Sequence, residues 1–342
     1  MILDTIKQLA KENGQETAFT FLDKGENLEL TFGEIFESAS SLAVSLKKNG
    51  LKEGERILIL ADQSAANIIS VVGSMFAKGV FVMVPPPVDE GKRKRLQSVL
   101  KACEPKFCLV SHDLLQKMTE GVLADMLGET VCLLDVEKQK DPVIEEIDLT
   151  RKQDDLVYIQ FTSGSTSEPK GIMVDYGNLM SSLYDSGASI TREQARVGLS
   201  WLPFYHNIGL LSVILRNFYN HTHFYIMKPE AFLKEPMSWF ENCTKYKVQF
   251  TAGPNSAFAL CANYITDDVA EKMDLSNLRY VLNGSEPVNY KTLQAFAYKF
   301  RLTGLDISCF CPAYGLAEVV CGVTTASGGV KLAEVDFESY KD

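Results

Sequence analysis

The chain has 342 residues, of which 46% are hydrophobic and 23% charged, and its formal net charge is −10 at pH 7. Such a chain is globular and long enough to bury a large core or to form two lobes. Its negative charge disfavours binding to nucleic acid or to an anionic membrane, because both carry phosphate. Residues 1–9 read as the start of an amphipathic helix, and no apolar run approaches the roughly 20 residues that span a bilayer. We therefore expect a cytoplasmic protein without a membrane span or a nucleic-acid partner.

The eight cysteines are scattered through apolar segments. Cys309 and Cys311 are close enough in sequence to suggest a metal pair, but no histidine lies near them in the chain and the spacing is not that of a zinc site. Reduced thiols in the core of a cytosolic protein are the favoured interpretation.

The first half of the chain alternates between short apolar strands and helices. Thr31 is expected to cap a helix that continues to residue 48, because apolar residues recur at helical spacing from Ile35 to Leu46 and Gly50 follows. The expected strands are residues 29–31, 56–60, 80–84, 107–110 and 130–134, and the other expected helices are residues 63–78 and 92–103. Residues 135–153 are polar and have no strong period, so we interpret them as a connection between two halves.

The alternation resumes after this connection. Strands are expected at residues 156–161, 197–201, 223–227, 248–252, 279–282 and 308–311, with helices at 207–220, 236–247 and 290–300. Short apolar strands separated by helices are typical of parallel βαβ units. The predicted fold class is therefore α/β, with two stacked αβ lobes within one domain over residues 1–342. The approximate lobes are residues 50–200, and residues 1–49 together with 201–342.

One loop carries the strongest chemical signal. The apolar strand at 156–161 leads directly into the sequence TSGSTSEPKG at residues 162–171. Hydroxyls and backbone N–H groups can hold phosphate oxygens, Lys170 adds a positive charge, and Gly164 permits close backbone approach. The loop is not the P-loop of NTPases, in which Gly immediately precedes the Lys and Ser or Thr follows it. On composition alone, an ordinary Ser/Gly surface loop is the simpler alternative.

Four segments, in order, resemble motifs of the adenylate-forming (acyl-CoA synthetase/luciferase-like) superfamily. TSGSTSEPKG resembles its phosphate-binding loop, and WLPFYHN at 201–207 resembles its substrate-side motif. NGSEP at 283–287 resembles its adenine-contact segment, and YGLAE at 314–318 its adenine- and metal-contact motif. Each motif is short and weak alone, but four in the expected order make chance similarity implausible.

Further segments look like one branch of that superfamily, the fatty acyl-AMP ligases. They are SWLPFYHNIG at 200–209, GPN at 253–255, SGG at 327–329 and VDF at 335–337. The resemblance covers nearly the whole chain. Two positions depart from the usual pattern: Ser167 stands where the loop usually has Gly, and Asn207 stands where Asp usually follows the motif His. Ser at a positive φ would cost on the order of 1 kcal/mol.

The resemblance implies attack of a carboxylate oxygen on the α-phosphorus of ATP, which gives an acyl-adenylate and pyrophosphate. It assigns phosphate binding to Thr162, Ser163, Gly164, Ser165, Thr166 and Lys170. It assigns adenine binding to Asn283, Gly284, Ser285, Glu286, Pro287, Tyr314 and Gly315. Mg²⁺ would be held by Thr166 and Glu318, and His206 would help to place the carboxylate, so that His206, Lys170 and Glu318 form the expected catalytic set.

Each of these roles has a structural alternative. Glu318 could be a solvated acid, Tyr314 a core residue, residues 283–287 a plain turn and His206 a structural histidine. We interpret the other histidines, His112, His221 and His223, as structural. An apolar set could line an acyl channel, although such stripes are usually core: Ile208, Leu210, Leu211, Ile214, Phe250, Gly253 and Phe258.

The implied function is activation of a fatty acid with ATP and Mg²⁺, after which the acyl group passes to an acyl carrier protein. An acyl-CoA ligase shares the first half-reaction and is the nearest alternative. A catalytically silent module that binds acyl chains or nucleotide is the alternative of another class. The resemblance also implies that these residues are the amino-terminal part of a larger enzyme whose mobile carboxy-terminal domain carries a catalytic Lys. The chain alone is therefore expected to adenylate poorly or not at all.

Overall fold

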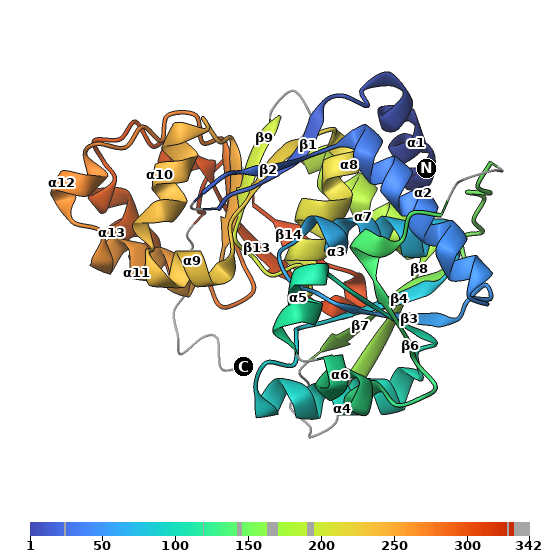
Figure 1. Ribbon diagram of the computed structural model, residues 1–342. Coiled ribbons are helices and arrows are strands. Elements are labelled where there is room, and N and C mark those ends of the chain that lie inside the picture. The colour runs from blue at the N-terminus through green and yellow to red at the C-terminus, as the bar shows by residue number, and fades with distance from the viewer. Residues whose placement is uncertain are drawn as a thin grey trace, which may run out of the picture.

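The computed structural model describes residues 1–23, 25–118, 120–141, 146–162, 170–189, 195–326 and 328–331. Its strands form two sheets, one of six strands and one of eight (Figure 1). The order of the first sheet is β6-β5-β3-β4-β7-β8, and that of the second is β14-β13-β12-β11-β9-β10-β1-β2. This arrangement is the mixed α/β fold with two mainly parallel sheets that the alternation of strand and helix signals predicts.

The six-stranded sheet is parallel except for its last strand, β8, which is antiparallel to β7. Three neighbouring strands, β5, β3 and β4, are buried apolar runs, as expected where helices cover both faces of a parallel sheet. The strands are β3 (Arg56–Leu60), β4 (Val80–Val84), β5 (Phe107–Val110), β6 (Cys132–Asp135), β7 (Leu156–Thr162) and β8 (Lys170–Asp175).

The eight-stranded sheet is parallel in its middle and has an antiparallel pair at each end, β1 with β2 and β13 with β14. Its strands are β1 (Thr17–Phe21), β2 (Leu28–Thr31), β9 (Val197–Ser200), β10 (His223–Ile226), β11 (Phe250–Gly253), β12 (Tyr280–Asn283), β13 (Phe310–Gly315) and β14 (Gly322–Thr325). Parallel strands end at the same edge of a sheet, so the segments that follow β9, β11, β12 and β13 are brought to one edge.

The helices fill the spaces around these sheets. The α-helices are α1 (Ile2–Glu12), α2 (Phe32–Lys48), α3 (Ala65–Phe76), α4 (Glu90–Cys103), α5 (His112–Lys117), α6 (Glu120–Leu127), α7 (Tyr176–Ser189), α8 (Arg216–Asn220), α9 (Pro229–Lys234), α10 (Met237–Lys245), α11 (Asn255–Tyr264), α12 (Asp267–Ala270) and α13 (Tyr290–Lys299). Short 3₁₀-helices are η1 (Val136–Lys138), η3 (Ile307–Cys309) and η4 (Ala317–Val319), and η2 (Ile208–Leu215) is a π-helix. Thr31 caps α2 as predicted, in a capping box with Glu34.

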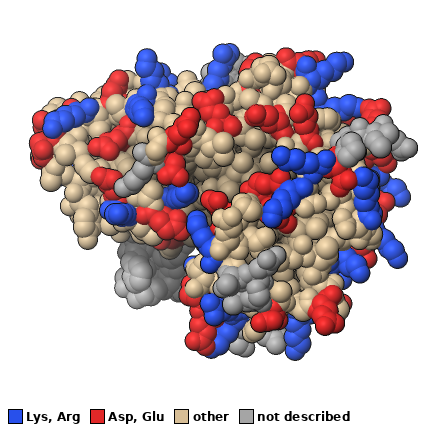
Figure 2. Space-filling view, viewed as in Figure 1, with Lys and Arg blue, Asp and Glu red and all other residues tan. Residues whose placement is uncertain are grey.

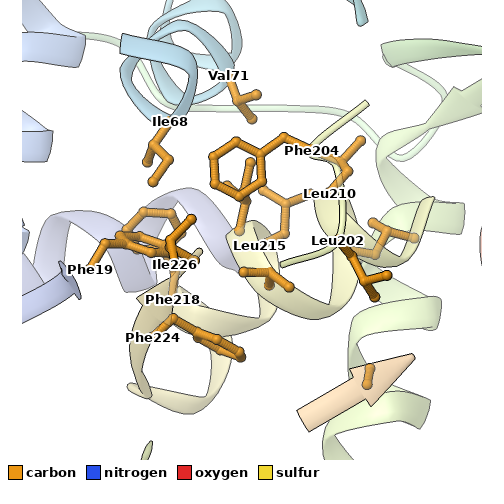
Figure 3. Packing of buried hydrophobic residues seen from close by; sticks show 14 of the residues in the cluster. Phe19, Ile68, Val71, Leu202, Phe204, Leu210, Leu215, Phe218, Phe224 and Ile226 are labelled. Carbon is orange, nitrogen blue, oxygen red and sulfur yellow. The ribbon is translucent and has the colours of Figure 1, made fainter. Parts of the chain in front are cut away.

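Alternating side chains of the six-stranded sheet enter two different cores. Leu58 and Leu60 of β3 pack with α4, α5 and α6 on the outer face. Ile57 and Ile59 belong to the large core that also includes α1, α2, α3 and the eight-stranded sheet. Figure 3 shows part of this shared core, where residues of β1 and α3 pack with residues 202–204, η2, α8 and β10. The two sheets are therefore joined by continuous apolar packing.

The eight cysteines carry free thiols, and six of them are buried, as the sequence predicts. Burial raises the pKa of Cys309 to about 12 and that of Cys321 to about 11. These thiols are therefore protonated at neutral pH and behave as small core residues. Within the described residues, no helix is long and apolar enough to cross a bilayer.

Candidate active site

The predicted phosphate loop connects the two strands of an antiparallel hairpin. Thr162 is the last residue of β7, Lys170 is the first residue of β8, and the two are register partners. Lys170 is exposed, so its ammonium group is available to a ligand. The loop residues Ser163, Gly164, Ser165 and Thr166 lie outside the described residues, as does Ser167. The hairpin therefore positions the two ends of the loop at the carboxyl end of β7.

The predicted adenine segments follow two neighbouring parallel strands. Asn283 ends β12 and is the register partner of Pro312 in β13, while Tyr314 and Gly315 end β13. A Cβ atom added to Gly284 would lie 3.0 Å from the carbonyl oxygen of Ala313. Glycine at this position therefore lets the chain leaving β12 pass close to β13, a reason that does not require a nucleotide.

Asn255 and Glu286 fix the 283–289 segment against α11. The Asn255 side-chain oxygen accepts from the backbone N–H of Asn289 at 3.0 Å and from the Asn283 amide at 3.4 Å. The Glu286 carboxylate accepts from the backbone N–H of Ser256 in the first turn of α11. An acid at a helix N-terminus satisfies a free N–H group and favours the helix dipole. Glu286 thus has a structural role here. Asn255 positions the 283–289 segment, and its contacts were not predicted from the sequence.

The Tyr314 ring is 61% exposed, so it is a free aromatic surface rather than a core residue. Tyr314 pairs with Thr324 of β14 across an irregular register. A Cβ atom added to Gly315 would lie 2.0 Å from the carbonyl oxygen of Cys321, which is too close for any side chain. The backbone packing of the turn that carries Glu318 and leads into β14 therefore requires glycine at position 315.

Glu318 lies in the short helix η4 and is exposed. Two residues later, Val320 adopts φ 70° and ψ −55°, and the Cys321 N–H donates to the Val319 carbonyl at 2.8 Å. These angles and this bond define a classic γ-turn, which is rare and strained, above all for a β-branched residue. Strain of this kind costs on the order of 1–3 kcal/mol and is often found where a functional side chain is held.

His206 follows β9, in a turn where its backbone N–H donates to the Pro203 carbonyl at 3.1 Å. Its Nδ1 accepts from the Ile208 N–H at 3.4 Å, which leaves the proton of the neutral ring on Nε2. The surrounding protein lowers the pKa of His206 by desolvating the charged ring, although part of the ring is exposed. At neutral pH this side chain is therefore an uncharged donor.

The helix expected at residues 207–220 is present but is not regular. Its first part is the π-helix η2, and only residues Arg216–Asn220 are α-helical. A Cβ atom on Gly209 would lie 2.1 Å from the Pro203 carbonyl oxygen, so the helix begins tightly against the turn before it. π-Helical turns are rare and frequently occur at functional sites. Most of the apolar residues proposed for an acyl channel are buried in the core here.

The strand of the phosphate loop contacts the His206 segment directly. The Gln160 side chain on β7 donates through Nε2 to the Tyr205 carbonyl at 3.1 Å. Because Gln160 lies two residues before Thr162, this bond brings two of the four predicted segments together across the two sheets. The sequence signal that could have identified this contact is Gln160 itself, a polar residue on the buried face of β7. The other histidines have the structural partners expected of them: His112 with Asp135, His221 with Glu16 and His223 with Thr20.

A cavity of about 580 Å³ lies between the two sheets, beyond the carboxyl ends of β3 and β5. Figure 2 shows this face of the molecule hollowed between α5 and α9. Pro203 and Tyr205 of the His206 segment form part of its wall, together with Gln63 and Ser111. Among the residues that the structure describes, none of those predicted to bind phosphate, adenine or metal lines it.

The metal prediction can be examined through the donor groups. Among the described residues, no three His, Cys, Asp or Glu side chains are grouped as a metal site requires. Glu318 would therefore act as a single protein carboxylate. Mg²⁺ commonly binds in this way, through one or two carboxylates while its other ligands are waters and substrate phosphates. The exposed carboxylate of Glu318 is compatible with a Mg²⁺ site of this kind.

Comparison with known proteins identifies the family. Residues 6–340 match the family described as AMP-binding enzyme. The medium-chain-fatty-acid–[acyl-carrier-protein] ligase JamA of Moorena producens is 29% identical over 96% of this chain and 57% of its own length. The long-chain-fatty-acid–AMP ligase FadD32 of Mycobacterium marinum is 30% identical over 94% of this chain and 52% of its own.

A solved structure has the same fold. The fatty acyl-adenylate ligase from L. pneumophila, in complex with acyl adenylate and pyrophosphate, superimposes with a TM-score of 0.87 at 29% identity. That match covers 96% of this chain and 57% of the ligase chain. The chain thus spans somewhat more than half the length of the relatives it matches. With the family matched across almost all of its residues, the chain belongs to the AMP-binding enzymes.

Proposed function

We propose that this chain provides the ATP- and acid-binding part of a fatty acyl-AMP ligase. The observation that carries the proposal is the position of the four motif segments. Each begins at the carboxyl end of a strand with a parallel neighbour: β7, β9, β12 and β13. Ligands of parallel α/β sheets bind beyond the carboxyl ends of the strands. The likeness to ligases that form acyl-adenylates supports the same assignment.

In the proposed reaction, a fatty acid carboxylate oxygen attacks the α-phosphorus of ATP. A bond forms between that oxygen and phosphorus, the bond to the β-phosphate bridging oxygen breaks, and pyrophosphate leaves with the electron pair. Two anions must meet, so the protein must reduce their repulsion and align them. Lys170, at one end of the phosphate loop, supplies positive charge. Its register partner on β7 is Thr162, so no acidic residue lies directly opposite it in the hairpin.

The neutral His206 is suited to the acid side of the site. Its Nε2–H can donate to a carboxylate oxygen and fix its direction, and a lowered pKa means that the ring does not form a competing charged pair with the nucleophile. On the nucleotide side, the exposed Tyr314 ring offers a stacking surface beside the chain that leaves β12. We assign Thr162, Ser163, Gly164, Ser165 and Thr166 to the phosphates, and residues 283–287 with Gly315 to adenine.

Mg²⁺ bound by Glu318 and Thr166 would neutralise charge on the leaving pyrophosphate. Glu318 suits this role because it is exposed and, among the described residues, has no basic partner that would compete with the metal.

An acyl carrier protein is the proposed acceptor of the activated acyl group. The relatives JamA and TtuA are described as [acyl-carrier-protein] ligases. Coenzyme A is the alternative acceptor, because another relative is described as a putative fatty-acid–CoA ligase. Thioester formation measured in parallel with holo carrier protein and with coenzyme A distinguishes the two.

ATP–pyrophosphate exchange with a panel of carboxylic acids tests the first half-reaction in the full-length protein. We expect exchange that depends on a fatty acid and decreases at least tenfold in Lys170→Ala, because a charge contact to phosphate is lost. Lys94→Ala is a suitable control, since Lys94 pairs with Glu90 on the surface of α4. Absence of exchange with every acid would favour the silent binding module, and undiminished exchange in Lys170→Ala would contradict the site assignment.

A further inference from the structure

Two glutamines, Gln63 in the loop after β3 and Gln160 on β7, bond to the backbone of the His206 segment, which follows β9 of the other sheet. The Gln63 side chain donates to the Leu202 carbonyl at 3.1 Å and accepts from the Phe204 N–H at 3.1 Å. Gln160 donates to the Tyr205 carbonyl at 3.1 Å. Three backbone groups within four residues are thus fixed by side chains that arrive from the opposite sheet.

Gln63 is presented by a loop that is itself fixed. The preceding residue, Asp62, accepts hydrogen bonds from Ser64, Asn67 and Ser111. These contacts tie the end of β3 to α3 and to the end of β5, so Gln63 is a stationary support. Gln63 does not lie on β7, the strand that leads into the phosphate loop.

Gln160 differs because it lies on the strand that leads into the phosphate loop. It is 9% exposed and shares a strand face with Tyr158 and Thr162, since side chains alternate along a strand. Tyr158 is buried in the core shared by both sheets, so Gln160 also faces the eight-stranded sheet. The end of this strand is held from its other side, where Arg95 donates to the Phe161 carbonyl at 3.0 Å.

Gln160 therefore links the position of β7 to that of the His206 segment. A displacement of β7 toward or away from the other sheet changes the Gln160–Tyr205 distance, and Tyr205 is the residue before His206. Short hydrogen-bonded links of this kind transmit small shifts because packed interiors do not deform continuously. Thr162, two residues beyond Gln160, is where the phosphate loop begins.

We propose that Gln160 is a positioning residue that couples occupancy of the phosphate loop to the placement of His206. The inference rests on the proposed function for the identity of the two ligands, ATP at the loop and a carboxylic acid at His206. It adds a specific physical link between them. Gln160 itself contacts neither ligand in this assignment.

Amide hydrogen exchange tests the coupling without requiring catalysis. In the full-length protein, MgATP added without a carboxylic acid should slow exchange in peptides covering residues 201–207 by about threefold or more. Gln160→Met keeps a similar side-chain size but removes the donor, and it should abolish most of this ATP response. Gln63→Met should raise the basal exchange of the same peptides while preserving the ATP response, because its support does not pass through β7.

Kinetics provide the second measurement. For Gln160→Met we expect the kcat of fatty-acid-dependent pyrophosphate exchange to decrease by about tenfold or more, with the KM for ATP changed by less than about threefold, because alignment rather than ATP binding is lost. In Gln160→Glu, activity relative to the unchanged protein should increase as the pH is lowered, because only a protonated carboxyl group can donate to the Tyr205 carbonyl. Melting temperatures of all variants separate these effects from loss of folding.

Two results would overturn the coupling: no ATP response at residues 201–207 in the unchanged protein, or a full response in Gln160→Met. Equal losses of kcat and of melting temperature in Gln160→Met and Gln63→Met would also overturn it, by showing a merely structural bond. Failure of the proposed function has a different signature, namely ATP-dependent protection of residues 201–207 without pyrophosphate exchange for any acid.

Discussion

The Cα atom of Gly315 lies so close to the carbonyl oxygen of Cys321 that an added Cβ atom would be 2.0 Å from that oxygen. This contact closes the turn that carries Glu318, between the end of β13 and the start of β14. The YGLAE segment therefore depends on a glycine for backbone packing, independently of any contact that the glycine makes with a nucleotide.

Gly315→Ala should destabilise this turn and reduce activity. The methyl group cannot be accommodated unless the Cys321 backbone moves, so we expect a loss of about 1–3 kcal/mol in the free energy of unfolding. ATP–pyrophosphate exchange should decrease as well, because the same movement displaces Glu318. Gly322→Ala is a matched control, since a Cβ atom at Gly322 meets nothing within 4 Å. Equal stability of the two variants would contradict the predicted clash.

Glu318→Gln should weaken the binding of Mg²⁺ without affecting folding. The side chain is exposed, so the free energy of unfolding should change by less than about 0.5 kcal/mol. The loss of a charged ligand should raise the Mg²⁺ concentration for half-maximal exchange by about tenfold, because hard cations prefer carboxylate oxygen. Glu271→Gln, at an exposed position after α12, provides the control. An unchanged Mg²⁺ dependence in Glu318→Gln would remove Glu318 from the metal site.

Asn255→Ala should release the 283–289 segment from α11. The variant loses the acceptor for the Asn289 N–H and the bond to Asn283, which should cost about 1–3 kcal/mol. We expect the KM for ATP to increase more than kcat changes, because the segment is assigned to adenine. Asn242→Ala is the control for stability alone, since Asn242 bonds to the Ser238 carbonyl in α10. A similar KM in both variants would argue against adenine binding at this segment.

The fold could be predicted from the sequence because its signals are local. Apolar runs such as Arg56–Leu60 and Val80–Val84 occur in the structure with the bounds expected, and Thr31 caps its helix through the predicted pattern. The strand β1 was not predicted, since its five residues derive their position from pairing with β10, about 200 residues later. The π-helical start of the 207–220 helix depends on the approach of Gly209 to Pro203, which a helical period does not encode.

From the sequence, members of the candidate site could be predicted only within short runs of consecutive residues. Motif similarity could identify Lys170, His206, Tyr314 and Glu318 as members of short segments. It could not indicate that Glu286 is bonded to the start of α11, or that Gln160 reaches Tyr205, because both contacts join elements distant in sequence. Long-range contacts of this kind follow from the register of the strands and the packing of the two sheets.

The acid dependence of stability provides a test of the His206 environment. Desolvation of the charged ring by the surrounding protein lowers the pKa of His206 below its usual value near 6.5, although the residue is exposed, and desolvation also lowers the pKa of His223. Below pH about 6.5 the unfolded chain then binds more protons than the folded chain, so stability decreases as the pH falls. At higher pH both states are neutral at these rings, and the effect vanishes.

His206→Gln should therefore reduce the loss of stability between pH about 7 and about 5, because it removes one of the groups that the unfolded state protonates preferentially. Glutamine retains a side-chain donor near the position of Nε2, so its stability at pH about 8 should be close to that of the unchanged protein. Chemical denaturation at several pH values gives the measurement, and His223→Gln provides a second variant with the same expected sign. If the pH dependence is steeper in His206→Gln than in the unchanged protein, the folded state must favour the charged ring. The role of His206 as a neutral donor to the carboxylate would then be untenable.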